Sequence, residues 1–90
     1  MQLQALVATL GQLDERQTIY AKRPWAPTCD AESTLSDVAP PGLEYFLEVH
    51  VANEVVGVFD DEEVVEDTVE QRTNLLIYYA ENDAFPEWVA

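Results

Sequence analysis

Apolar residues near the start of the chain recur at the spacing of an α-helix. Four of them share one helical face: Leu3, Leu6, Val7 and Leu10. Gly11 follows the last of these residues, and glycine is a common stop signal for a helix. The pattern therefore predicts a short amphipathic helix over residues 2–11.

A strand and then a loop-like segment are predicted next. Residues 17–22 (QTIYAK) are rich in β-branched and aromatic side chains, which favours a strand. Two prolines end this strand and bracket Trp25. Residues 26–42 carry scattered Ser, Thr and Asp and finish in a Pro-Pro-Gly turn, so they predict a loop. This segment is too short to separate two domains, and we expect residues 1–90 to form a single domain.

The apolar pattern of residues 43–51 changes to strict alternation. Four residues of this segment point one way in a strand: Tyr45, Leu47, Val49 and Val51. The alternation favours a strand. A helix stays open as an alternative, because a second apolar set fits helical spacing: Leu47, Val51, Val55 and Val58.

An acidic helix is predicted in the second half of the chain. Asp60 or Asp61 is placed to cap a helix whose first turn is rich in acid, which suits the positive end of the helix dipole. We expect this helix over residues 61–73. Residues 75–79 (LLIYY) are either its end or a separate strand, and we favour the strand; a turn follows at residues 82–83. Together these elements predict a small α+β domain with a few-stranded antiparallel sheet.

The charge of the chain is strongly negative and unevenly distributed. Eighteen Asp and Glu residues face four Lys and Arg residues, a formal net charge of −14. Residues 1–25 sum to +1 and residues 26–90 to −15. Because 48% of the residues are hydrophobic, the acidity does not indicate disorder. Such a surface repels nucleic acid and anionic membranes and attracts basic proteins.

The acids are densest between residues 60 and 70. Seven of these eleven positions are acidic: Asp60, Asp61, Glu62, Glu63, Glu66, Asp67 and Glu70. On one helix they would span roughly 16 Å, or about one charge per 2.4 Å. Duplex DNA carries one charge per roughly 1.7 Å, so this face is expected to fit a positive groove that normally holds phosphates. The alternative is a solvated face that keeps the protein soluble.

Two tryptophans are candidate anchors for a partner protein. Trp25 lies between two prolines, and Trp88 lies in an aromatic C-terminal segment (FPEW). Tryptophan and tyrosine are the most frequent energetic anchors of protein interfaces. The alternative for Trp25 is that its ring closes the edge of a small hydrophobic core.

Catalytic and metal-binding signals are weak. Cys29 is the single thiol and His50 the single imidazole, and no glycine-rich turn or oxyanion-hole pattern accompanies them. The run at residues 60–63 offers carboxylate oxygens but lacks the alternating pattern of a calcium loop. The three glycines are isolated, so no phosphate-binding loop is present. We predict no enzyme activity, no bound metal and no cofactor.

The expected compartment is the cytoplasm. A single cysteine excludes an intrachain disulfide and fits a reducing environment. The N-terminal residues lack the basic and apolar regions of a secretion signal. The sequence also contains no apolar run long enough to predict a membrane span.

Three segments resemble those of a family of small uncharacterised bacterial proteins. They are residues 18–25 (TIYAKRPW), 45–49 (YFLEV) and 78–86 (YYAENDAFP). The resemblance covers most of the chain but implies no activity and no site residues. In size and acidity the chain is also similar in type to two groups of inhibitors. These are phage anti-CRISPR proteins that occupy nucleic-acid grooves and immunity proteins that neutralise nuclease toxins.

These patterns favour a non-enzymatic inhibitor of a basic, nucleic-acid-handling protein, such as a nuclease or a CRISPR effector. Its acids at residues 60–70 would compete with phosphate, and Trp25 or Trp88 would supply an apolar anchor. We expect no direct binding to nucleic acid or membrane, and the oligomeric state stays open. The main alternative is an interaction module of a regulatory or housekeeping assembly that binds through an apolar surface. A small enzyme and a metal buffer are further alternatives.

Overall fold

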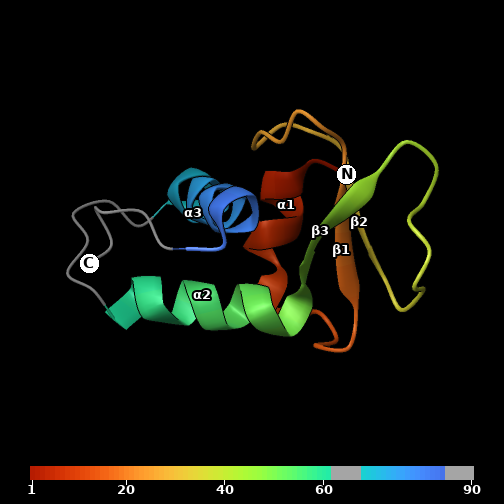
Figure 1. Cartoon of the computed structure of the whole chain (residues 1–90). Helices are drawn as coiled ribbons and strands as arrows, with labels where there is room; N and C mark the ends of the chain where they lie inside the picture. The colour runs from red at the N-terminus through yellow and green to blue at the C-terminus, as the bar shows by residue number, and fades with distance from the viewer. Residues whose placement is uncertain (62–67, 85–90) are drawn as a thin grey trace.

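A three-stranded antiparallel sheet with helices packed on one face forms the fold (Figure 1). The computed structural model describes residues 1–61 and 68–84. Within these ranges the elements are α1 (Leu3–Ala8), the 3-10 helix η1 (Leu10–Gln12), β1 (Thr18–Ala21), β2 (Ala31–Thr34), β3 (Glu44–Glu48), α2 (Val49–Asp61) and α3 (Val69–Asn82). The predicted α+β class is confirmed.

The sheet has the strand order β2-β1-β3, with β1 in the centre. Ile19 pairs with Leu47, but the next residue, Tyr20, pairs with Tyr45. Phe46 is therefore an extra residue in β3, which forms a β-bulge. Phe46 and Leu47 are both buried although they are neighbours in sequence. The bulge thus lets one short strand turn two consecutive side chains toward the core.

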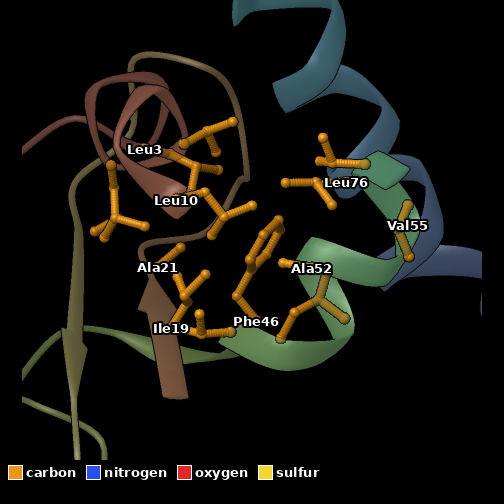
Figure 2. Close-up of a cluster of buried hydrophobic side chains, with 14 of the residues drawn as sticks. Leu3, Leu10, Ile19, Ala21, Phe46, Ala52, Val55 and Leu76 are labelled. Carbon is orange, nitrogen blue, oxygen red and sulfur yellow. The ribbon is translucent and has the colours of Figure 1, made fainter. Parts of the chain in front are cut away.

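The hydrophobic core lies between the helices and one face of the sheet (Figure 2). Phe46 is 1% exposed. Figure 2 shows its ring in the middle of the cluster, between the strand residues Ile19 and Ala21 and the helix residue Leu76. The buried cluster consists of Leu3, Leu6, Val7, Leu10, Ile19, Ala21, Ala31, Phe46, Leu47, Val49, Ala52, Val55, Val56, Leu75 and Leu76.

The N-terminal helix is confirmed, with a different end. α1 stops at Ala8, and a 3-10 helix follows that contains Gly11, so glycine does not end the α-helix. The chain before α1 runs along the edge strand β2. There the Ala31 N–H donates a hydrogen bond to the Met1 carbonyl oxygen at 2.7 Å. The first residues therefore cover part of one sheet edge, which would otherwise expose unpaired backbone groups.

The prediction of a loop throughout residues 26–42 is wrong for β2. The sequence of β2 is Ala-Glu-Ser-Thr, which has a low preference for strands. Its four residues pair with the whole of β1, from Thr18 opposite Thr34 to Ala21 opposite Ala31. Pairing with a strongly strand-forming neighbour therefore decides the state of β2, and a local pattern cannot show such a neighbour.

The predicted strand at residues 43–51 ends early. β3 stops at Glu48, and α2 begins at Val49. The helical alternative is correct for the second part of the segment, because one face of α2 is buried: Val49, Ala52, Val55 and Val56. The alternation through Val49 and Val51 favoured a strand, but the same two residues also fit helical spacing, so the local pattern could not decide between the two elements.

The predicted helix over residues 61–73 is correct for residues 69–73, is interrupted at Thr68, and falls outside the described residues at 62–67. The strand favoured for residues 75–79 is wrong, and the alternative that these residues end a helix is correct. α2 ends at Asp61, and a separate helix, α3, continues to Asn82. α3 begins after Thr68, whose extended backbone and side-chain oxygen cap it by accepting the Gln71 N–H. A short apolar run looks the same in a buried strand and in a buried helix. The predicted turn at residues 82–83 coincides with the helix end, where Asp83 is left-handed.

Candidate protein-interaction surfaces

The seven acids of residues 60–70, which were expected on one helix, do not lie on one helix. Asp60 and Asp61 are the last residues of α2, whereas Glu70 is exposed in the first turn of α3. The other four acids of this segment lie outside the described residues: Glu62, Glu63, Glu66 and Asp67. The spacing derived for a single helix is therefore wrong. Asp60 and Asp61 also do not cap the start of a helix, because they lie at the end of one.

Most acids with described side chains face solvent. Eleven acids belong to this set, and nine of them are exposed. The nine are Glu15, Asp30, Glu32, Asp37, Glu44, Glu54, Glu70, Glu81 and Asp83. They are distributed over the loops, the strands and two helices. Negative charge therefore surrounds much of the described surface and is not confined to the segment at residues 60–70.

Ion pairs within the chain can neutralise only a small part of this charge. Asp14 pairs with Arg16 at 2.7 Å, and this pair lowers the pKa of the Asp14 carboxyl from 3.8 to about 2. Among the described residues Glu44 also pairs with Arg23, and Glu48 lies 3.2 Å from the His50 imidazole, a contact that is an ion pair only when the imidazole is protonated. The chain has eighteen acids and four Lys and Arg residues, so most carboxylates have no basic partner within the chain.

Trp25 is engaged within its own chain. Its indole Nε1 donates a hydrogen bond to the Ala21 carbonyl oxygen at 3.2 Å, and its ring meets Phe46 edge to face at 5.0 Å. The Arg23 guanidinium lies 3.8 Å from the centre of the ring, which is a cation–π contact. Arg23 is held in turn by Glu44 at 2.9 Å. These contacts support the alternative that Trp25 closes the edge of the core.

The role of Trp25 as a partner anchor stays a prediction. A partner side chain would reach the covered face of the indole only after displacing Arg23. Trp88, the other predicted anchor, lies outside the described residues.

The face of the sheet turned away from the helices carries a different set of side chains. Tyr20 alternates with the core residues Ile19 and Ala21, so it points to this outer face. Its neighbours across the sheet are Glu32 on β2 and Tyr45 on β3. In the next row Thr18 lies between Thr34 and Glu48.

The loop between β2 and β3 covers part of this outer face (Figure 1). The Tyr20 hydroxyl donates a hydrogen bond to the Ser36 carbonyl oxygen at 2.9 Å. Tyr20 is consequently 4% exposed although it lies outside the main core. The Ser36 hydroxyl donates to the Val38 carbonyl oxygen and accepts from the Val38 N–H, which folds this part of the loop into a tight turn.

Large apolar groups remain exposed on and beside the outer face. Tyr45 is 53% exposed, Leu35 61% and Val38 75%. Partial burial raises the pKa of the Tyr45 hydroxyl, and the negative charge of Glu48 raises it further. Sequence reasoning did not select these residues. The available signal was the presence of Leu35 and Val38, two large apolar side chains, in a segment otherwise predicted to be a polar loop.

Described residues also line two surface cavities. One, of about 330 Å³, lies between the N-terminal residue, α1 and β2. The other, of about 260 Å³, lies between α1, α2 and α3 and includes Asn53 and Arg72 in its lining. Neither cavity contains Cys29 or His50. Within residues 1–61 and 68–84, no cluster of three potential metal ligands occurs.

The structure does not bring Cys29 and His50 together. Cys29 packs against the core, and its carbonyl oxygen accepts the Leu3 N–H at 2.8 Å. His50 is exposed, and its Nδ1 lies 3.2 Å from a Glu48 carboxylate oxygen. Both residues therefore have other neighbours, and the geometry gives no nucleophile–base pair.

Comparisons with known proteins give no assignment. The chain matches no protein-family model, no curated protein and no solved structure. The resemblance to small bacterial proteins therefore stays a prediction. Among the helices of the described residues, none combines the length and the apolar character needed to cross a membrane.

Proposed function

We propose that this protein is a non-enzymatic inhibitor that binds a basic, nucleic-acid-handling protein and blocks its nucleic-acid site. The target would be a nuclease toxin or a CRISPR effector. One observation carries the proposal. The chain has a large surplus of carboxylates, and nine of the eleven with described side chains are exposed to solvent. Internal pairing therefore leaves most of the charge available to a partner.

The physical basis is competition for a positively charged surface. The cationic side chains that line a phosphate-binding groove repel one another when the groove is empty, and they attract anions from solution. An acidic protein that fills the groove relieves this repulsion. Electrostatic attraction of this kind accelerates association and weakens as salt is added. The proposal does not need a single acidic helix. Asp60 and Asp61 belong to α2 and Glu70 to α3, and the proposal requires only that residues 60–70 carry a high density of negative charge.

Charge reversal of this segment tests the proposal. The variant Glu63→Lys, Glu66→Lys, Asp67→Lys, Glu70→Lys would be added to basic nucleases and CRISPR effectors in DNA-cleavage assays, beside the unmodified chain. A matched control reverses four exposed acids elsewhere: Glu15→Lys, Glu54→Lys, Glu81→Lys and Asp83→Lys. We expect the first variant to lose inhibition and the control to keep most of it. The proposal fails if the unmodified chain inhibits none of these enzymes.

An interaction module that binds through an apolar surface is the second candidate. The exposed side chains of Leu35, Val38 and Tyr45 favour it. The salt dependence of binding separates the two candidates. Binding to a basic groove weakens steeply with added salt, whereas binding through apolar contacts changes little. A complex that survives high salt would favour the second candidate.

A further inference from the structure

The outer face of the sheet combines exposed apolar groups with acids. Tyr45 lies on this face, and the turn that contains Leu35 and Val38 folds against it through the Tyr20–Ser36 hydrogen bond. Burying a side chain such as Tyr45 against a partner removes apolar area from water and stabilises a complex. The described part of the chain places no helix over this face (Figure 1).

Acidic side chains surround these apolar groups. Glu32 pairs across the sheet with Tyr20, and Glu48 lies close enough to Tyr45 to raise its pKa. Asp37 lies in the turn between Leu35 and Val38 and is exposed. Two basic residues lie nearby: Lys22 directly follows β1, and Arg23 is paired with Glu44, the residue before Tyr45. The acids Glu32, Asp37 and Glu48 outnumber them. The surroundings of Tyr45 are therefore predominantly negative.

This combination selects the kind of protein that can cover the face. A second copy of the chain would bring two sets of carboxylates together, and the chain as a whole carries a net charge of −14. Such like-charge contacts disfavour self-association. A protein surface with Lys or Arg around an apolar centre fits both the apolar groups and the charges.

We propose that the outer sheet face, formed by Tyr45 and by the loop residues Leu35 and Val38 that the Tyr20–Ser36 hydrogen bond ties to the same face, is the apolar contact surface for a basic protein partner. This inference rests on the proposed function. It replaces the predicted anchor Trp25 with the outer face, because the Trp25 ring already contacts Arg23 and Phe46. The acids at residues 60–70 would add long-range attraction. The outer face would supply the contact from which water is excluded.

Nuclear magnetic resonance with a defined probe maps this contact. The isotopically labelled full chain would be titrated with a synthetic peptide that alternates lysine with leucine. A peptide of the same length that alternates serine with leucine is the control. We expect the largest shift changes at Leu35, Val38, Tyr45 and Glu48, and much weaker binding of the control peptide. Changes confined to α3 and residues 60–70, or the absence of binding, would overturn the inference.

A pair of matched variants measures the contribution of the face. The outer-face variant is Leu35→Ser, Val38→Ser, Tyr45→Ser. The control variant, Val58→Ser, Val69→Ser, Tyr78→Ser, changes three exposed apolar residues on the helices. We expect the outer-face variant to bind the lysine–leucine peptide at least about tenfold more weakly, and the control to change affinity by less than about threefold. Equal losses in both variants would contradict a specific contact surface. Circular dichroism would verify that both variants fold.

The same variants separate this inference from the proposed function. If the chain inhibits a nuclease and the outer-face variant inhibits it equally well, the contact surface is wrong and the function stands. If the peptide binds the outer face but the chain inhibits none of the enzymes, the function is wrong and the contact surface stands.

Discussion

The two faces of the sheet share the same strands but carry different kinds of side chain. On the core face, Ile19, Phe46 and Leu47 are buried against the helices. On the outer face, Tyr20 is covered by a loop while Tyr45 stays half exposed beside Glu48. The helix-covered face carries the apolar packing that stabilises the fold. The outer face carries the mixed apolar and acidic character that suits an interaction with another protein.

The largest expected difference in unfolding free energy is between variants of two neighbouring residues that lie on opposite faces of the sheet. Phe46→Ala should lower the free energy of unfolding by roughly 3–5 kcal/mol, because it leaves a cavity in the core and removes the Trp25 contact. Tyr45→Ala should cost less than about 1 kcal/mol, since its side chain is 53% exposed. Urea denaturation of both variants measures the two values. Similar losses would mean that the two faces do not differ in their contribution to stability.

A smaller effect is expected where the loop meets the outer face. Tyr20→Phe removes the hydroxyl that donates to the Ser36 carbonyl oxygen and keeps the buried ring. We expect a loss of about 0.5–1.5 kcal/mol in unfolding free energy. Amide hydrogen exchange should become faster in the turn around Ser36 while the core strands stay protected. Unchanged exchange in this turn would show that the hydrogen bond does not hold the loop.

The smallest expected effect concerns the titration of Tyr45. Its pKa should lie above the ordinary value of 10.0, because of partial burial and the Glu48 charge. A raised folded-state pKa means that the folded chain keeps this proton longer than the unfolded chain. The stabilising contribution is therefore complete below the ordinary value and is lost as pH rises through the folded value. Nuclear magnetic resonance of the tyrosine rings measures this pKa, and Glu48→Gln should lower it.

The sequence predicted the parts of this fold that depend on short-range patterns. The N-terminal helix follows from the spacing of Leu3, Leu6 and Leu10, and β1 follows from its β-branched and aromatic residues. The sequence did not predict strand β2 (Ala-Glu-Ser-Thr), because pairing with β1 and not its own composition stabilises this strand. The candidate site shows the same division. The number of acids is visible in the sequence, but their division between α2 and α3 is not.

Trp25 and Tyr45 illustrate why anchors are difficult to choose from sequence. Trp25 follows β1 and Tyr45 lies within β3. The sequence analysis selected Trp25 and Trp88 as anchors and did not select Tyr45. In the folded chain Arg23 covers the Trp25 ring, and the ring packs on Phe46, while Tyr45 remains half exposed. The β-bulge at Phe46 produces this difference, because it adds a second consecutive core residue to β3 without turning Tyr45 inward.

By itself, the sequence determined the α+β class, the position of the first helix and the central strand, and the large negative charge. These properties depend on composition and on contacts between residues close in the chain. The tertiary structure decided the edge strand, the break between α2 and α3, and the choice of aromatic residues that stay exposed. Those properties depend on pairing and packing between segments far apart in sequence, which no local pattern records.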